Sequence, residues 1–410
     1  MKAPMLSMDE ALAALLARAR AVAETEAVET LHAAGRVLAQ NVASTIYVPP
    51  MDNTSMDGYA VRAADVTQAG TRLAVTQRIP AGYVGEALPP MAAARIFTGA
   101  MIPAGADAVV MQEQCSAEKT AEGDAVVVNH VPAPGEWIRR RGDDIAAGST
   151  VLSAGVRLTP QACGLAASVG LRQLAVRRRL KVAVFFTGDE LAMPGEALKP
   201  GAIYNSNRFM LRGLVEGLGC VLTDLGIVHD TLADTRAALR AAAHDHDLIV
   251  TTGGVSVGEE DHVRPAVEAE GHIDLWQIAI KPGKPLAHGR VRRPDGSEAD
   301  FIGLPGNPVS SFVTFLLFVR PFILACQGAT SLGPLALSMP AHFDWPKPDR
   351  RREFLRGRIN ATGGIDLFPN QSSAVLTSTV WGDGLIDTPP GQAIARNDTV
   401  RFLPFAGLLQ

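Results

Sequence analysis

The stretch that decides the fold is Leu248-Ile249-Val250-Thr251-Thr252-Gly253-Gly254-Val255-Ser256-Val257-Gly258. It opens with a short apolar and β-branched run, Leu248–Thr252, that ends directly in two glycines. A run of this length bounded by glycine is typical of a strand buried in a parallel sheet. The stretch therefore predicts a central sheet strand whose carboxyl end carries a polar, glycine-rich loop.

Similar runs alternate with helical patterns over residues 181–330, which is the sequence form of βαβ units. The predicted strands are Lys181–Phe186, Val221–Gly226, Leu248–Thr252, Ile273–Ile280 and Phe301–Gly303. The predicted helices are Ser206–Leu218, Leu232–His244, His262–Glu270 and Val309–Leu324. We therefore expect residues 181–330 to form an αβα domain with a mostly parallel sheet.

The preceding residues predict two other kinds of structure. Residues 42–145 contain short β-prone runs separated by Gly and Pro clusters, and they predict a β-rich insert domain. The runs are Arg72–Ile79, Asp107–Gln112 and Ala125–Val131. Residues 1–41 and 146–180 predict a helical, linking N-terminal domain, because Ser7 and Glu10 have capping-box spacing and Thr159-Pro160 starts a second helix.

Residues 331–410 return to alternating strand patterns with turn residues between them. The predicted strands are Glu353–Ile359, Ala374–Ser378 and Thr399–Phe405. These patterns predict a C-terminal β-barrel domain. The fold class expected for the whole chain is multidomain, α/β plus β.

Composition favours a cytoplasmic globular protein. Of 410 residues, 47% are hydrophobic and 20% are charged, which is ordinary globular usage. The formal net charge of -4 gives no general attraction to nucleic acid or to acidic membranes, so neither partner is expected. The four cysteines lie far apart without a C-x-x-C pair, which argues against a zinc site and a disulfide framework. The most apolar stretch, Phe312–Leu324, is shorter than the ~20 residues of a membrane span and predicts a buried helix.

Polar tips follow nearly every predicted strand of residues 181–330. They are Thr187-Gly188-Asp189-Glu190, the loop holding Asp230, Gly253–Gly258 with Asp261 beyond it, Lys281-Pro282-Gly283-Lys284-Pro285, and Pro305-Gly306-Asn307-Pro308. In open parallel sheets, ligands bind in the crevice outside the carboxyl ends of the strands. We therefore expect these tips to meet in one site.

The tips combine groups that suit phosphates with a hard metal ion. Glycine amides and the lysines Lys281 and Lys284 attract oxyanions. Glu190, Asp230 and Asp261 would repel one another if crowded, so a cation is needed, and Mg²⁺ bridges carboxylate and phosphate oxygens well. The alternative is that each carboxylate is only a helix cap or a solvated loop residue.

Other motifs are weaker. Gly254-Val255-Ser256-Val257-Gly258 fits G-x-S-x-G, but a hydrolase nucleophile follows its strand immediately, and here the strand ends about four residues earlier. The P-loop and Rossmann fingerprints do not occur in the sequence. Asp57-Gly58 and Thr98-Gly99 are compatible with ordinary turns.

Together, the ordered motifs resemble the MoeA family of molybdopterin molybdenumtransferases, which is related to the E domain of gephyrin. They are TGDEL at Thr187–Leu191, GGVSVG at Gly253–Gly258, KPGKP at Lys281–Pro285, LPGNPVS at Leu304–Ser310, MDGYAVR at Met56–Arg62 and IFTGAMIPAGADAVV at Ile96–Val110. The resemblance implies a homodimer that joins molybdate to adenylylated molybdopterin with Mg²⁺ and releases AMP. It also implies contacts with molybdopterin adenylyltransferase and with cofactor-accepting proteins.

Site residues are carried over by matching motifs. The resemblance implies that Glu190, Asp230 and Asp261 are catalytic and bind the metal, and that Lys281 is catalytic through its charge. Asp57 and Thr98 match catalytic positions that face the partner subunit's cleft. The implied substrate-binding residues are Thr187, Gly188, Asp189, Gly253, Gly254, Ser256, Gly258, Lys284, Pro305, Gly306, Asn307, Pro308, Arg352 and Ser373.

One position departs from the family pattern, because Trp276 is followed by Gln277 where the family commonly has lysine. The alternative functions are a molybdopterin adenylyltransferase, which shares the αβα domain, and a non-catalytic gephyrin-like scaffold. The long insert and the C-terminal domain disfavour the first. The second would be expected to carry an additional adenylyltransferase domain.

Overall fold

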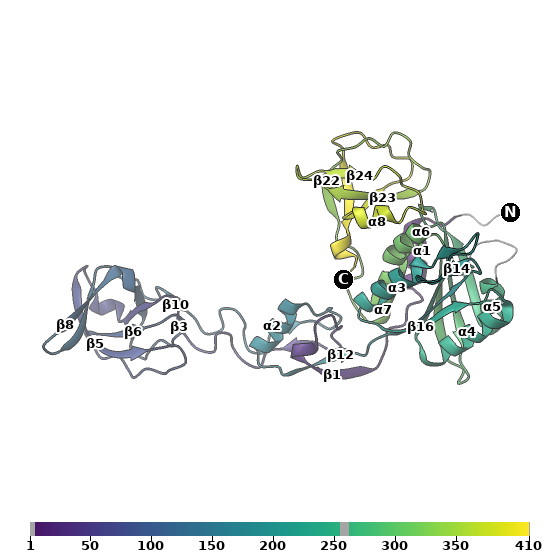
Figure 1. Ribbon diagram of the computed structural model, residues 1–410. Helices are drawn as coiled ribbons and strands as arrows, with labels where there is room; N and C mark the ends of the chain where they lie inside the picture. Colours follow the sequence, from purple (N-terminus) through teal and green to yellow (C-terminus); the bar gives the residue numbers. More distant parts are fainter. Residues whose placement is uncertain (1–4, 255–261, 410) are drawn as a thin grey trace.

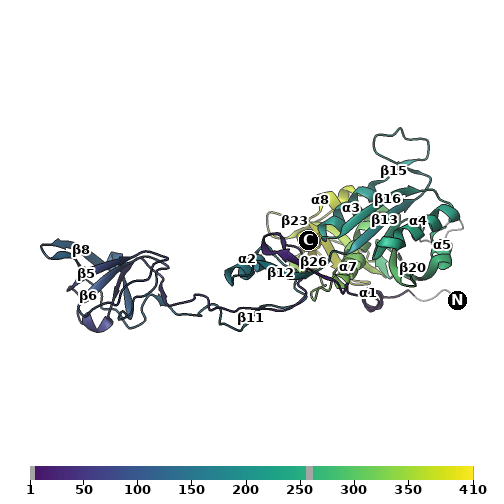
Figure 2. The same cartoon turned by 90° about the horizontal axis from the view of Figure 1, so that it is seen from below.

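The computed structural model describes residues 5–254 and 262–409, so the predicted site residues Ser256, Gly258 and Asp261 lie outside the described residues. The molecule is elongated (Figures 1 and 2). The insert lies at one end, a narrow linking region occupies the middle, and the αβα region with the C-terminal region lies at the other end.

A six-stranded sheet with the order β16-β13-β17-β21-β20-β18 forms the centre of the αβα region. Its strands are β13 (Lys181–Thr187), β16 (Val221–Val228), β17 (Leu248–Thr252), β18 (Gly271–Gln277), β20 (Pro285–Arg292) and β21 (Glu298–Leu304). The pairs β13 with β16, β13 with β17, and β17 with β21 are parallel, as predicted. The sequence predicted no strand at β20, which pairs antiparallel with β18 and β21, because this segment begins with proline and contains Gly289.

Helices cover both faces of this sheet. One face packs against α1 (Met8–Leu16), α3 (Ser206–Gly217), α6 (Pro308–Thr314) and α7 (Arg320–Cys326). The other packs against α4 (Leu232–Asp245) and α5 (Val263–Glu270). The capping box of Ser7 and Glu10 is formed at the start of α1. A two-stranded ribbon, β14 (Leu191–Ala192) with β15 (Ile203–Tyr204), projects between β13 and α3.

The predicted apolar helix is confirmed as a core helix. Residues 308–326 run continuously from α6 through a π-helical turn, Phe315–Val319, into α7. Among the described residues this is the one helix long and apolar enough to cross a membrane, but 94% of its apolar window is buried inside the protein. Its side chains therefore pack against the sheet.

The insert is a six-stranded sheet with the order β7-β4-β6-β5-β9-β8. Its strands are β4 (Gly58–Val61), β5 (Thr71–Ile79), β6 (Ala92–Ile96), β7 (Ala108–Met111), β8 (Cys115–Thr120) and β9 (Gly123–Val128), with short helical turns η2 (Ala63–Asp65) and η3 (Gln112–Gln114). Alternate residues of β4 pack into two separate cores, with Tyr59 and Val61 on one face and Ala60 on the other. Both faces of this sheet are therefore covered.

Two-stranded ribbons connect the insert to the rest of the protein. They pair β3 (Asn53–Thr54) with β10 (Ile138–Arg139), β2 (Val42–Ala43) with β11 (Thr150–Leu152), and β1 (Thr25–Glu29) with β12 (Gln173–Arg177). The turn η1 (Thr30–His32) and the predicted helix α2 (Pro160–Ser168), capped by Thr159, pack beside the last pair.

The C-terminal region forms a third six-stranded sheet, with the path β19-β23-β25-β26-β22 and β24 paired to β23. The elements are β19 (Ile280–Lys281), β22 (Leu337–Pro340), β23 (Arg352–Ile359), β24 (Ile365–Leu367), β25 (Gly384–Thr388), β26 (Thr399–Pro404), α8 (Thr377–Trp381) and η5 (Phe405–Gly407). A single bridge between Ala341 and Ile365 brings the segment after β22 to β24. Full closure into a barrel stays a prediction.

One predicted element of the C-terminal region is wrong. The sequence predicted a strand at Ala374–Ser378, but Thr377–Trp381 form the helix α8. The Ser378 hydroxyl donates to the Val375 carbonyl and accepts a hydrogen bond from the buried Arg356 guanidinium, 3.0 Å away. These contacts favour the helical turn over the β propensity of the segment.

We predict that Gly58→Ala loosens the insert, because a Cβ at Gly58 would lie 1.9 Å from the Val110 carbonyl oxygen in the paired strand. Overpacking of this kind costs about 3 kcal/mol. Hydrogen exchange followed by mass spectrometry should show faster exchange in peptides covering β4 and β7, with the central sheet unchanged. Gly164→Ala in α2 is the control, because nothing lies within 4 Å of its Cβ position. Unchanged exchange in Gly58→Ala would contradict the packing described for β4.

Candidate active site

The carboxyl ends of the parallel strands meet at one edge of the central sheet. In the strand register, Thr187 is opposite Val228, Phe186 is opposite Thr252, and Thr252 is opposite Leu304. The antiparallel pair β18 and β20 also turns at this edge, since Gln277 is opposite Pro285. The loops that carry the predicted polar tips therefore emerge along the same side of the sheet.

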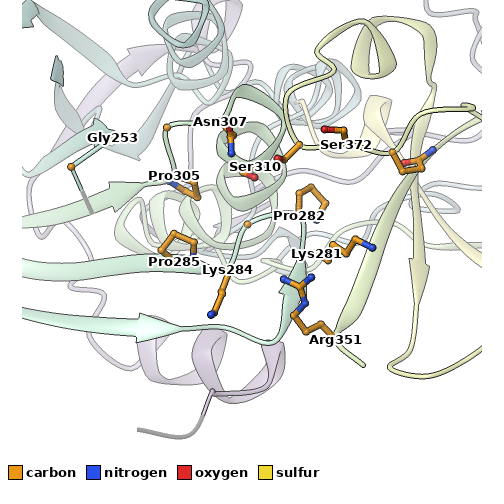
Figure 3. Close-up of a pocket in the computed structure, with 15 residues that line it drawn as sticks. Gly253, Lys281, Pro282, Lys284, Pro285, Pro305, Asn307, Ser310, Arg351 and Ser372 are labelled. Carbon is orange, nitrogen blue, oxygen red and sulfur yellow. The ribbon is translucent and has the colours of Figure 1, made fainter. Parts of the chain in front are cut away.

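A cavity of about 550 Å³ lies at this edge (Figure 3), a volume typical of small-molecule sites. It is lined by Gly253, Gly254, Lys281, Pro282, Gly283, Lys284, Pro285, Pro305, Gly306, Asn307, Ser310, Arg351, Gln371, Ser372 and Ser373. Three predicted tips and the predicted Ser373 are thus brought together. The predicted Pro308 begins α6 directly beside the cavity residue Asn307.

Glycines allow the tips to touch. Gly253 has a φ of +87°, and a Cβ there would lie 3.1 Å from the carbonyl oxygen of Thr187. A Cβ on Gly306 would lie 3.8 Å from the Cα of Gly253. The ends of β13, β17 and β21 therefore lie close together. A side chain at Gly253 would be crowded and strained, whereas a Cβ at Gly306 would make only an ordinary contact.

Asn207 of α3 connects the end of β17 to the loop that follows β21, and the sequence did not identify this residue. Its side chain is buried and donates hydrogen bonds to the Gly306 carbonyl (2.8 Å) and to the Thr252 hydroxyl (3.3 Å). It thus ties two of the tips to a helix. The sequence did contain one signal for this role, because Asn207 lies just inside the start of a predicted helix. Asparagine near a helix start is more often explained by helix capping.

Three cations face the cavity from one side, Lys281, Lys284 and Arg351, and Asn307, Ser310 and Ser372 lie across from them (Figure 3). Lys284 is exposed, whereas Lys281 is partly buried. Positive charge opposite hydroxyl and amide groups suits a tetrahedral oxyanion or a phosphate.

Carboxylates of the C-terminal region hold two of these cations. Arg351 forms a bidentate pair with Asp349, with its Nε 3.0 Å from Oδ1 and its Nη2 2.9 Å from Oδ2. This pairing holds the pKa of Asp349 well below its usual range and raises that of Arg351. The Lys281 ammonium lies 3.4 Å from Asp349 Oδ2 and 3.1 Å from Glu353 Oε1.

The structure puts Arg351, and not the predicted Arg352, in the cavity. Successive side chains of a strand point to opposite faces, and β23 begins at this point. Arg352 donates instead to both carboxylate oxygens of the buried Asp387, at 2.6 and 2.7 Å, and to Asp9 of α1 at 3.2 Å. It lines a separate cavity of about 240 Å³ and joins α1 to the C-terminal sheet.

Of the predicted acidic residues that the structure describes, neither Glu190 nor Asp230 is part of the cavity lining. The carboxylate of Glu190 folds over Gly188, so that a Cβ there would be 2.6 Å from Oε2. Asp189 is exposed next to it, and Asp230 follows the end of the neighbouring strand β16. Residues 5–254 and 262–409 contain no group of three metal-binding side chains, and Asp261 lies outside them, so the triad stays a prediction.

The described carboxylates fit a hard cation. Glu190 and Asp230 follow adjacent parallel strands, and the Glu190 loop reaches the cavity through the contact between Thr187 and Gly253. Carboxylate oxygens are the ligands that Mg²⁺ takes in proteins, together with phosphate oxygens.

Asp57 and Thr98 lie in the insert, at the opposite end of the molecule from the cavity (Figure 1). The backbone N–H and the hydroxyl of Thr98 both donate to Asp57 Oδ1 at 2.7 Å. The Thr98 backbone hydrogen bond is the largest cause of a lowered pKa for the Asp57 carboxyl. These two residues form a local pair that does not reach the cavity of their own chain.

We predict opposite phenotypes for the two neighbouring arginines. Arg351→Ala removes a cavity cation and should weaken sulfate binding about tenfold, with little loss of stability. Arg352→Ala leaves the buried Asp387 without its bidentate partner and should lower the free energy of unfolding by about 3 kcal/mol, with sulfate affinity nearly intact. Calorimetric titration and thermal denaturation measure the two effects. If Arg351→Ala lowered the stability and Arg352→Ala weakened sulfate binding, the side-chain directions described here would be wrong.

Family comparisons cover almost the whole chain. Residues 6–170 match the MoeA N-terminal region (domain I and II), residues 183–325 match a probable molybdopterin binding domain, and residues 338–405 match the MoeA C-terminal region (domain IV). All residues that line the cavity fall in the second and third of these matched regions.

Individual relatives agree with the family matches. The molybdopterin molybdenumtransferase of Haemophilus influenzae is 41% identical over 411 residues, covering 99% of this chain and 100% of the relative. Molybdopterin molybdenumtransferase 2 of Mycobacterium tuberculosis is 37% identical, covering 87% of this chain and 89% of the relative. The crystal structure of the molybdopterin biosynthesis moeA protein from Pyrococcus horikoshii OT3 aligns with a TM-score of 0.83 at 29% identity, covering 98% of this chain and 100% of that one. The chain therefore belongs to the MoeA family of molybdopterin molybdenumtransferases.

Proposed function

We propose that the protein transfers molybdenum from molybdate to adenylylated molybdopterin, releasing AMP with the help of Mg²⁺. The observation that carries this proposal is the basic cavity at the carboxyl edge of the sheet, with carboxylates on the neighbouring strand ends. Both reactants are anionic, and a chain with a net charge of -4 must bind them through local positive charge.

The basic side chains act as the oxyanion site. Lys284 and Arg351 attract the tetrahedral dianion, and the hydroxyl groups of Ser310 and Ser372 donate hydrogen bonds to its oxygens. Gly253 and Gly254 leave backbone open to the ligand, where a phosphate group approaches closely. The cavity volume of about 550 Å³ accommodates the part of the substrate where the pterin phosphate meets the oxometalate.

The acidic loops hold the divalent ion. Glu190 and Asp230, with Asp261 as the family resemblance implies, would hold Mg²⁺, and the bound ion would supply positive charge to offset the charge on the departing AMP. Water cleaves the phosphoanhydride. The two dithiolene sulfurs bond to molybdenum, and their protons leave with one molybdate oxygen as water, so the metal is neither oxidised nor reduced.

The partner subunit completes the site in this proposal. Asp57 and Thr98 are paired and exposed at the far end of an elongated chain, so the cleft they serve belongs to a second copy. We propose a cytoplasmic homodimer in which each insert closes the partner's cavity. Molybdopterin adenylyltransferase and cofactor-accepting proteins are its proposed protein partners.

We predict that Glu190→Gln and Asp230→Asn each lower the rate of AMP release at least about a hundredfold, because each removes a charged ligand of the ion. Raising the Mg²⁺ concentration should recover part of the loss. Release of AMP from adenylylated molybdopterin in the presence of molybdate, followed by chromatography, measures the rate. Glu196→Gln is the control, because within the described part of the chain its carboxylate accepts one hydrogen bond, from the Met193 backbone N–H. Full activity of both variants would reject the metal site.

We also predict that subunits complement one another. Co-expressed Asp57→Ala and Lys284→Ala chains, purified as heterodimers through two different tags, should regain about half of the wild-type activity, because one of two shared sites is then intact. Each homodimeric variant should be nearly inactive. A heterodimer as inactive as both parents would show that the insert does not serve the partner's cavity.

A further inference from the structure

One strand of the C-terminal sheet comes from the loop that carries the cavity lysines. The strand β19, Ile280–Lys281, pairs in parallel with β23, and Lys281 is directly opposite Glu353. The flanking strands β18 and β20 belong to the central sheet. The loop is therefore shared between two sheets, and a residue of the C-terminal region faces the lysine across the pair.

Glu353 is almost fully buried, with 1% of its side chain exposed. Its Oε2 accepts hydrogen bonds from the Trp345 indole N–H and the Asp349 backbone N–H, both at 2.9 Å. Its Oε1 accepts no aligned hydrogen bond from the described residues but lies 3.1 Å from the Lys281 ammonium. The carboxylate is thus fixed on one side and directed at the cavity lysine on the other.

This contact reduces the positive charge that the cavity presents. Asp349 and Glu353 lie within ion-pair distance of Lys281, and Asp349 also neutralises Arg351. Among the described residues, no carboxylate forms an ion pair with Lys284. Carboxylates therefore oppose two of the three cavity cations and weaken their attraction for the ligand, whereas Lys284 has no ion pair with a carboxylate of the described residues.

We propose that Glu353 is a specificity-determining counter-charge of the oxyanion site, which lowers the affinity of the cavity for abundant tetrahedral dianions such as sulfate and phosphate. This inference rests on the proposed function. A site with three unopposed cations would hold any such dianion tightly. With Glu353 in place, tight binding requires further bonds, which the dithiolene provides for an oxometalate and cannot provide for sulfate.

Loss of the Glu353 charge has two opposite effects on anion binding. It removes a negative charge close to the bound dianion, which strengthens binding. It also removes one of the carboxylates that position the Lys281 side chain, which weakens binding. The charge effect acts on a dianion in a partly desolvated site and falls off slowly with distance. The positional effect is limited to the ordering of one side chain, and Asp349 still holds Lys281. The charge effect therefore dominates.

The test compares the affinities of the purified wild-type protein and the Glu353→Gln variant for sulfate, each measured by calorimetric titration. We expect binding about tenfold tighter than in wild type, which is about 1.4 kcal/mol. Sulfate should also become a stronger competitor of molybdate during AMP release. A residue with only a structural role would weaken sulfate binding or leave it unchanged when substituted, and either result would overturn the proposal.

Two matched variants separate charge from geometry. Glu353→Asp keeps the charge and shifts the carboxylate, and Trp345→Phe keeps the charge and removes one hydrogen bond to it. Both should bind sulfate within about threefold of wild type, since side-chain geometry alone has a modest effect. A gain in either variant as large as that of Glu353→Gln would mean that packing controls the affinity.

The proposal stays testable if Glu353→Gln does not fold. Asp349→Asn removes the other carboxylate near Lys281 and should also tighten sulfate binding. The two hypotheses fail separately. Wild-type protein that binds neither sulfate nor molybdate would remove the oxyanion site of the proposed function, whereas wild-type binding that Glu353→Gln leaves unchanged removes only the role of Glu353.

Discussion

The parallel register of four adjacent strands is the constraint on which the rest of the structure depends. Because β16, β13, β17 and β21 run in the same direction, their carboxyl ends lie at one edge, and the turn between β18 and β20 falls at that edge as well. Backbone contacts at Gly253 and Gly306 then bring the loops close enough to form one cavity. Without this alignment, the lysines and carboxylates of the chain would be ordinary surface charges.

The C-terminal region contributes to the cavity in two ways. It adds Arg351 and the Gln371–Ser373 segment to the wall, and it takes β19 into its own sheet. The wall segment is anchored by the buried Arg356, whose side chain donates to the Ser372 carbonyl at 3.2 Å and whose backbone bonds Gln371. Burial lowers the pKa of Arg356 to about 10, so this cation stays charged at neutral pH. The region thus sets both the shape and the charge of the site.

The insert lies at the opposite end of an elongated chain from the cavity. The linking ribbons hold the insert far from the cavity, yet Asp57 and Thr98 keep an ordered, exposed pair at that end (Figure 1). Cation–π contacts of Arg78 and Arg95 with Phe97 order the neighbouring surface. A prearranged polar surface of this kind is what the proposed closure of a partner's cavity requires.

The sequence by itself determined the parallel strands of the central sheet, the buried helix at residues 308–326 and the polar tips, because apolar periodicity, glycine and proline act locally. Resemblance of the ordered motifs identified the family. Only the tertiary structure decided that Arg351 faces the cavity while Arg352 binds Asp387, that Asn207 ties two tips together, and that residues 377–381 are helical. It alone paired Lys281 with Glu353. The physical reason is that the direction of a side chain and its partner depend on which strands pair, and these pairs join segments far apart in the chain.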